Sequence, residues 1–200
     1  MDGARTVQRD WRKSARAGSL VDMSERVRLD DNLSCEIRLE EYCDIKRLLD
    51  EFGEAAYPAV KTYYSACGFE AGYDLLLALL KEGRLSREKI RQDPPESLRF
   101  LLQEFFTRRG GNQPILEREG TTVTLKTENT VFCPSPIAQK ESGVPHKDVC
   151  HIHKRAFVEG LSRVLEAFIP GVQIQYVNVS SRSIEPGADC VEAFHVQTPW

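Results

Sequence analysis

Apolar residues in the first half of the chain recur at the three- to four-residue spacing of amphipathic helices. One such stripe runs over 39–52, and a longer one runs over 58–82. A short helical turn is predicted at 86–89. Asp93 and the two prolines after it are typical of a helix start, and the helix that follows is expected to end at Gly110. This half of the chain is therefore predicted to be helical.

The spacing then changes to that of β-strands. The stretch 114–127 is rich in β-branched residues, and apolar positions alternate with threonines around Val123. It predicts two short strands around a turn at Glu119 and Gly120. The stretch 130–133 is predicted to be a third strand or the end of the second, because the prolines after it stop a strand.

A second helical pattern begins at Pro145 and continues to Pro170. Strands are predicted at 172–179 and 190–196, with a turn at 185–189. This order predicts an α+β fold, in which N-terminal helices pack on a mainly antiparallel sheet and a long helix is inserted between the hairpin and the final strands. No repeat and no second domain is apparent, so residues 35–200 are expected to form a single ligand-binding domain.

Composition narrows the classes of partner. The 200 residues carry a formal net charge of −3, which argues against a nucleic-acid-binding surface. No apolar run reaches the roughly 18–20 residues of a bilayer span, and the N-terminus lacks the apolar core of a signal peptide. We therefore expect a cytoplasmic protein whose six cysteines stay reduced. Residues 1–34 are predicted to form a basic, flexible tail.

Cysteine and histidine gather on the helix predicted after 145. His146, Cys150 and His153 share one face of that helix, whereas His151 points elsewhere. One cysteine at a strand end and one at the start of the last strand would complete four ligands of the types that zinc prefers. The predicted metal site therefore consists of Cys133, Cys150, His153 and Cys190, with His146 as a helper and zinc, or else iron, as the metal.

Two other interpretations of these residues stay open. In one, Cys133 and Cys190 are buried strand residues and the histidines sit on an exposed helix start. In the other, Cys150 gains thiolate character from its place near a helix N-terminus, and His146 or His153 acts as its base.

Small residues occupy the middle of the helix predicted at 58–82. A glycine in a helix costs about 1 kcal/mol relative to alanine, so close approach of another helix is the favoured explanation and a pocket floor is the alternative. An apolar pocket for a small molecule is predicted between this helix, the helix around 98–106 and the sheet. The residues expected to line it are Tyr64, Gly68, Gly72 and Phe105. The helices carry more apolar residues than one buried face requires, which is compatible with a homodimer.

Several short motifs are similar to those of the prokaryotic L-2-amino-thiazoline-4-carboxylic acid hydrolase-like family. More loosely, the chain resembles the vinyl-reductase-type (hydrocarbon-binding) domains, and both groups are associated with the ligand-binding fold of nitric-oxide signalling and Golgi transport. Two departures concern the metal site: related sequences have cysteine at the positions of His153 and Arg182. The matching stretches are "YYSACGFEAGYDLL" at 63–76, "CPSPIA" at 133–138, Cys150, "FIPGVQIQYV" at 168–177 and "EPGADC" at 185–190.

The resemblance implies a small-molecule-binding domain with a Cys/His metal site that opens a cyclic amidine-type ring, such as an aminothiazoline carboxylate. A catalytic metal would activate water only if one coordination position stayed open. The chain offers enough ligands to close the site and no clear acid–base pair. The alternative is therefore a non-catalytic sensor or carrier of the vinyl-reductase type with a purely structural metal, and whether the protein is an enzyme is left open.

Overall fold

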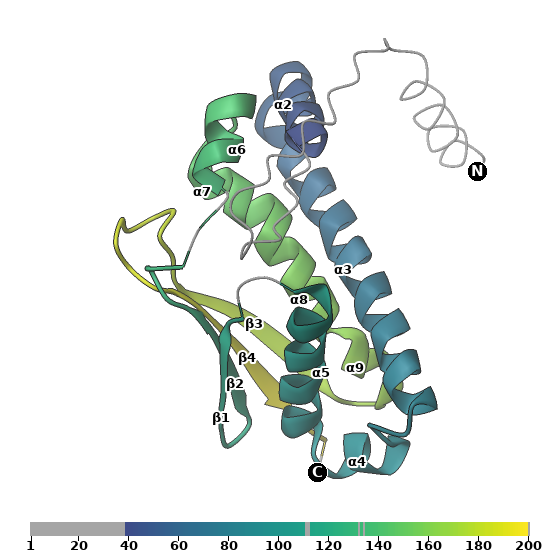
Figure 1. Ribbon diagram of the computed structural model, residues 1–200. Coiled ribbons are helices and arrows are strands. Elements are labelled where there is room, and N and C mark those ends of the chain that lie inside the picture. Colours follow the sequence, from purple (N-terminus) through teal and green to yellow (C-terminus); the bar gives the residue numbers. More distant parts are fainter. Residues whose placement is uncertain (1–38, 111–112, 132, 134, 200) are drawn as a thin grey trace, which may run out of the picture.

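The computed structural model describes residues 39–110, 113–131, 133 and 135–199. The predicted basic tail, 1–34, lies outside these residues. The helices, in chain order, are α2 (Leu39–Phe52), η1 (Gly53–Ala55), α3 (Ala56–Lys81), α4 (Arg87–Gln92), α5 (Pro94–Arg109), α6 (Ser135–Ser142), α7 (His146–Val149), η2 (Cys150–Arg155), α8 (Ala156–Ser162) and α9 (Val164–Phe168). Figure 1 shows α3 running along one side of the molecule, with α8 beside it and α5 in front of the sheet.

The strands form one antiparallel sheet in the order β1-β2-β4-β3. Its strands are β1 (Ile115–Glu119), β2 (Thr122–Thr127), β3 (Gln173–Ser180) and β4 (Cys190–Gln197). The hairpin β1–β2 turns at Gly120, which has a φ of 57°. The predicted α+β class is confirmed: helices pack on an antiparallel sheet, and helical segments separate the hairpin from the last two strands.

Local signals in the sequence position two of the helices. The side chain of Asp93 accepts a hydrogen bond from the backbone N–H of Glu96, and Pro94 and Pro95 occupy the first turn of α5. Ser86 caps α4 in the same way through Lys89 N. These caps satisfy backbone donors at helix starts, which explains why the sequence predicted both starts correctly.

Three segments differ from the sequence-based expectation. The strand expected at 130–133 is wrong, because β2 ends at Thr127. A helix that was not predicted, α6, follows it. The single long helix expected after Pro145 is divided instead into α7, η2, α8 and α9, and η2 is a π-helix. The π-helix is wider than an α-helix, so residues three apart in η2 no longer share a face.

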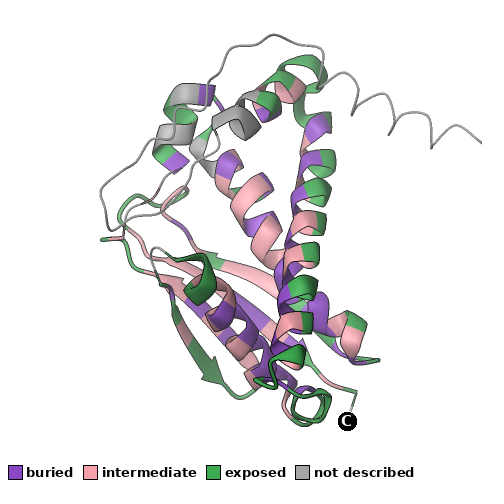
Figure 2. Ribbon diagram, turned by 45° about the vertical axis from the view of Figure 1, so that its right-hand side comes forward, coloured by how far each residue is buried: buried purple, intermediate pink, exposed green. Residues whose placement is uncertain are grey.

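The apolar core has two parts. The larger part joins α3, α5, α8 and α9 to the sheet and includes Leu76, Leu101, Leu161 and Phe194, all fully buried. The smaller part joins α2, the first half of α3 and the segment from 144 to 156. Figure 2 shows buried and exposed stripes along α3, as expected of a helix that packs on one side.

Helices α3 and α8 approach each other at glycines. A Cβ atom at Gly68 would lie 1.9 Å from the backbone oxygen of Phe157, and one at Gly72 would lie 2.9 Å from that of Leu161. The reverse contact is as tight: a Cβ at Gly160 would lie 1.8 Å from the oxygen of Ser65. The favoured explanation of these glycines, close packing of another helix, is confirmed.

Candidate functional site

The face of the sheet that meets the helices changes from apolar to polar along its length. Opposite pairs on β3 and β4 mark the change: Ile174 faces Val196, Tyr176 faces Phe194, and Asn178 faces Glu192. Ile174, Val196 and Phe194 are buried in the larger core. The next pair, Asn178 and Glu192, places an amide and a carboxylate on the same inward-facing side of the two strands. Polar groups at this end of the inter-layer space therefore need polar partners.

A buried arginine lies over this polar end. Arg155, the last residue of η2, is only 8% exposed. Its Nη2 donates to Ser183 Oγ at 3.5 Å. With the Asn178 amide oriented to suit its neighbours, Arg155 Nη1 donates to the amide oxygen at 3.2 Å, and the Asn178 nitrogen donates to Ser180 O. Arg155, Tyr176, Asn178 and Glu192 are called the polar cluster below.

Tyr176 Oη and Glu192 Oε2 are buried and make no hydrogen bond of good geometry. The two side chains are nevertheless close enough for the tyrosine hydroxyl to interact with the carboxylate. Burial raises the pKa of Glu192 to about 7, and the nearby charge of Arg155 only partly opposes this. Burial, and next the Glu192 carboxylate, raise the pKa of Tyr176 far above its usual range. The tyrosine hydroxyl therefore keeps its proton, and the Glu192 carboxylate is the nearest acceptor for it.

Glu159 on α8 lies at the edge of the same region. Its Oε2 stands 3.3 Å from Lys61 Nζ on α3, which compensates the charge, but it makes no hydrogen bond. Buried polar atoms without partners are rare in folded proteins, and in a native fold they commonly mark bound water, an ion or a ligand. Glu159, with Lys61, lines the groove between α3 and α8. The oxygens of Tyr176 and Glu192, on β3 and β4 near Arg155, make the polar cluster the candidate site.

Part of the predicted metal site is brought together. The Cys150 thiol, at the start of η2, donates to Ser135 Oγ at 3.4 Å, and Cys133 is close enough to raise the pKa of Cys150. Burial is the larger cause of that increase. Cys150 is therefore a protonated thiol near neutral pH, which disfavours a role as nucleophile.

The other predicted ligands lie on different elements or faces. The ring of His153 packs against Tyr64 of α3, with centroids 4.1 Å apart, so it faces the helical layer. Cys190 opens β4, opposite Thr127. The side chain of His146 lies outside what the structure describes, and His151 is exposed. Among the described residues, no group of three or more His, Cys, Asp or Glu side chains could hold a metal ion.

The residues predicted to line a pocket have different surroundings. Gly68 and Gly72 meet the backbone of α8, as described above. Tyr64 belongs to the smaller core, and the ring of Phe105 lies 5.7 Å from that of Phe157, between α5 and α8. The aromatic residues thus pack between helices, on the same side of the sheet as the polar cluster.

A groove runs along the outside of the α3–α8 pair. It has a volume of about 780 Å³ and is lined by residues that include Phe69, Ser65, Ala66 and Gly160. Several of its lining residues are exposed, Ala66 and Arg163 among them. A shallow surface of this kind does not enclose a small molecule.

Arg155, Tyr176 and Glu192 are not among the site residues predicted from the sequence. One signal was present: Glu192 occupies the inward register of β4, in alternation with Phe194 and Val196. A carboxylate at a core-facing strand position needs a partner, so it could have been identified as a functional candidate. The position of Arg155 could not have been identified from the sequence, because it depends on the π-helical turn of η2.

Comparisons with known proteins give limited guidance. No family model matches the sequence, and no curated protein matches it. Among solved structures, the fold is similar to a trafficking protein particle complex subunit 3 from Naegleria fowleri, solved covalently bound to palmitic acid. The TM-score is 0.45 at 12% identity, over 80% of this chain and 92% of that one. The predicted resemblance to the aminothiazoline hydrolase-like family stays a prediction.

Proposed function

We propose that this chain is a non-catalytic small-molecule-binding domain, a sensor or carrier, whose ligand occupies the inter-layer region at the polar cluster. The observation that carries the proposal is the buried polar cluster, in which Tyr176 Oη and Glu192 Oε2 lie close together without a hydrogen bond of good geometry. A ligand that donates to the acceptors and accepts from Tyr176 would remove the free-energy cost of leaving them unpaired, about 1–3 kcal/mol each.

The hydrolytic alternative receives less support. Metal-assisted ring opening requires a cation with an open position for water. The described residues offer no group of three ligands, and the Cys150 thiol is protonated near neutral pH because burial raises its pKa. Glu192 could accept a proton, because burial raises its pKa to about 7. Binding without chemistry is therefore the better-supported function.

The helices and the sheet suit this function. In the described part of the chain no helix has the length and apolar character of a membrane span. The sheet supplies a floor that α8 covers through the apolar core around Leu161 and that η2 covers through the polar contacts of Arg155. Polar groups on a rigid floor fix a ligand's orientation, and the neighbouring rings of Phe157 and Phe194 offer apolar contact.

Saturable binding of the neutral fluorescent probe N-phenyl-1-naphthylamine tests the proposal. Wild-type protein should bind the probe at one site per chain. Asn178→Trp, which fills the polar cluster, should weaken binding at least about fivefold, since the large ring takes the ligand's place. Gln175→Trp is the matched control, because Gln175 is exposed on the same strand.

Circular dichroism should show that both tryptophan variants keep the wild-type fold. Should Asn178→Trp misfold, Glu192→Leu replaces it, since it leaves Tyr176 Oη without the carboxylate neighbour. Non-saturable probe binding, or equal binding by the folded variants and the wild type, would refute a site at the polar cluster.

A further inference from the structure

The outer edge of β3 carries backbone groups that no described strand uses. β1 and β3 are the two edge strands of the sheet, so only one side of each is paired. The N–H of Val196 on β4 donates to Thr121 O beside β2, so Val196 and the residue opposite it, Ile174, are a non-hydrogen-bonded pair. Because this pattern alternates along an antiparallel ladder, Ile174, Tyr176 and Asn178 direct their N–H and C=O groups away from β4.

The usable part of this edge is short and well defined. At one end, Ile174 N donates to Glu166 Oε1 at 2.6 Å, so a carboxylate already occupies that N–H. At the other end, the regular register with β4 breaks just after Asn178, where β3 bulges. Between these limits, the N–H groups of Tyr176 and Asn178 donate to no other residue in the part of the chain that the structure describes. The free edge is therefore centred on Val177.

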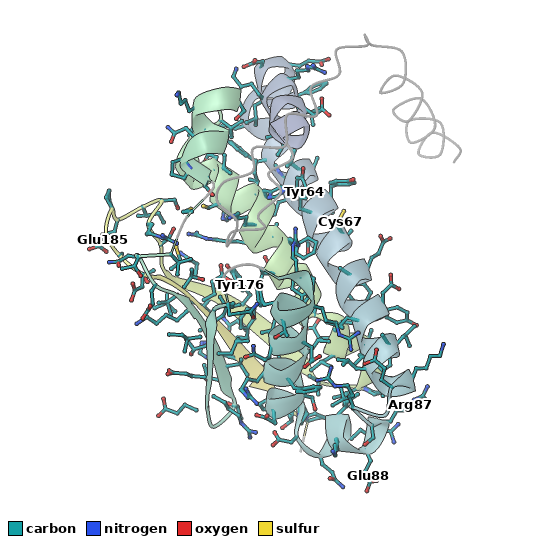
Figure 3. All side chains as sticks on the ribbon, viewed as in Figure 1. Tyr64, Cys67, Arg87, Glu88, Tyr176 and Glu185 are labelled. Carbon is teal, nitrogen blue, oxygen red and sulfur yellow. The ribbon has the colours of Figure 1, made fainter. Side chains whose placement is uncertain are left out.

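β3 also lacks the features that protect edge strands. Proteins keep an exposed edge from pairing by making it short or by placing charged residues or proline on it. β1 follows this rule, since it has five residues and includes Glu117, Arg118 and Glu119. β3 has eight residues, none of them charged and none of them proline. The acidic Glu185 lies at the outer end of the loop that follows β3, away from Tyr176 (Figure 3). β3 is therefore the edge that favours pairing with a further strand.

A second copy of the chain supplies a matching strand. Antiparallel pairing around a twofold axis at Val177 sets Tyr176 of each copy opposite Asn178 of the other, and each of these pairs forms two backbone hydrogen bonds. Val177 then faces Val177 of the other copy across the axis, with the two Cα atoms about 4.5 Å apart. Like charges at directly opposite positions destabilise a strand pair, and β3 brings none.

Side chains beside the edge fit the same register. A groove of about 450 Å³ adjoins the start of β3 and is lined by residues that include Val172, Ile174 and Gln175. In this register Gln175 lies opposite Val179 of the other copy, and Val179 is 61% exposed in one chain. Each copy thus offers an exposed apolar side chain and a groove that receives one. This contact adds to the strand edge, which by itself buries less than the roughly 800 Å² per partner of a standard interface.

We propose that the chain forms a twofold dimer through the outer edges of β3, with Val177 of both copies at the axis. The pairing joins two four-stranded sheets into one continuous sheet and leaves the helices of both copies on the same face. The inference goes beyond the proposed function, because it concerns a second copy of the chain and requires no ligand.

Sedimentation velocity of the full chain tests the inference at concentrations from about 1 to 100 μM, where an interface of modest size associates. At the upper end the wild type should have twice the 22.7 kDa mass of one chain. Val177→Lys and Val177→Glu should each be monomeric, since like charges meet at the axis. An equimolar mixture of these two variants should regain the dimer mass, because opposite charges then meet there.

Ile115→Lys is the matched control. Ile115 is 41% exposed on β1, the other edge strand, so this variant should dimerise like the wild type. Circular dichroism checks that each variant is folded. Should Val177→Lys misfold, Val179→Lys at the more exposed position should raise the dimer dissociation constant at least about tenfold.

Four outcomes would overturn the inference. They are a monomeric wild type at about 100 μM, a folded Val177→Lys variant that still dimerises, a mixture of the lysine and glutamate variants that stays monomeric, and an Ile115→Lys variant that loses the dimer.

Discussion

Gly160 and Ser65 stand so close that a Cβ atom on the glycine would lie 1.8 Å from the serine's backbone oxygen. This contact, with its counterpart between Gly68 and Phe157, brings the backbones of α3 and α8 together. No side chain larger than hydrogen fits there without moving a helix. Since η2 continues directly into α8, the same contact positions Arg155 over the sheet.

Alanine substitutions at the three helical glycines should destabilise the fold in a graded order. Gly160→Ala and Gly68→Ala should each lower the free energy of unfolding by about 2–3 kcal/mol, because overpacking outweighs the gain of about 1 kcal/mol in helix propensity. Gly72→Ala should cost less, since its Cβ would lie 2.9 Å from the nearest atom. Urea denaturation measures all three, and an increase in stability for Gly160→Ala would contradict the packing described here.

Glu192 should make stability depend on pH. Its pKa of about 7 in the fold exceeds the ordinary value of 4.5, so the folded state holds a proton that the unfolded state has released between these values. This stabilisation is fully present below about pH 4.5 and is lost as the pH rises through about 7, on the order of 2–3 kcal/mol in total. The difference in unfolding free energy between wild type and Glu192→Gln should follow that course.

The control for this measurement is Glu88→Gln, because Glu88 is exposed on α4. The pH course of the Glu192→Gln difference should stand out from that of this surface control. A flat profile for Glu192→Gln would mean that Glu192 is not buried as a neutral acid.

The pair of Arg84 and Glu104 should contribute to stability through the buried carboxylate. Glu104 is 6% exposed and accepts two hydrogen bonds from Arg84, one of them 2.6 Å long between Nη2 and Oε1. Arg84→Met should cost about 1–2 kcal/mol, because it leaves Glu104 buried with only Arg108 nearby, 3.5 Å away. Arg47→Met, at an exposed pair with Asp44, should cost no more than about 0.5 kcal/mol.

Adding Glu104→Gln to Arg84→Met should restore part of the loss, since the second change removes the uncompensated charge. Thermal unfolding of Arg84→Met, Glu104→Gln and the double variant gives the interaction free energy of the two side chains in a double-mutant cycle. Strict additivity would show that the two side chains do not interact.

Cys150 should react slowly with iodoacetamide. Burial raises the pKa of its thiol, and only the thiolate is a nucleophile. Alkylation of the native protein at pH 7, followed by peptide mass spectrometry, should show slower labelling of Cys150 than of Cys67 on α3, and the Cys150 rate should increase toward pH 9. Rapid labelling of Cys150 at pH 7 would favour the reactive-cysteine interpretation instead.

Zinc binding by Cys133, Cys150, His153 and Cys190 stays a prediction of the sequence. Metal analysis of protein purified with reduced thiols and without chelator tests it. One zinc per chain that is lost in both Cys150→Ala and Cys190→Ala, and kept in Cys67→Ala, would establish the site. Metal-free wild-type protein would refute it.

Much of the fold could be predicted because its signals are local. The Asp93 cap, the turn at Gly120 and the alternation along β4 each depend on residues within a few positions of one another. The strand expected at 130–133 failed for the opposite reason. Backbone oxygens of Asn129 and Val131 accept hydrogen bonds from Arg182, a residue some fifty positions away that no local pattern identifies.

The candidate site was predicted only in part, because it too depends on contacts between residues that are distant in sequence. Spacing placed Cys150 and His153 on one face of an α-helix, but the π-helical turn of η2 separates them, one toward Ser135 and the other toward Tyr64. The same π-helical turn positions Arg155 over the sheet.

By itself, the sequence determined the helices ahead of the hairpin, the hairpin, the antiparallel class and the tight packing of α3, because caps, turns and apolar periodicity act over a few residues. Only the tertiary structure decided which polar side chains meet. Arg155, Tyr176 and Glu192 come from three separate elements, and their partial desolvation exists only once the helices cover the sheet. Burial is a property of the assembled layers, so the raised pKa of Glu192 and the buried position of Arg155 appear only there.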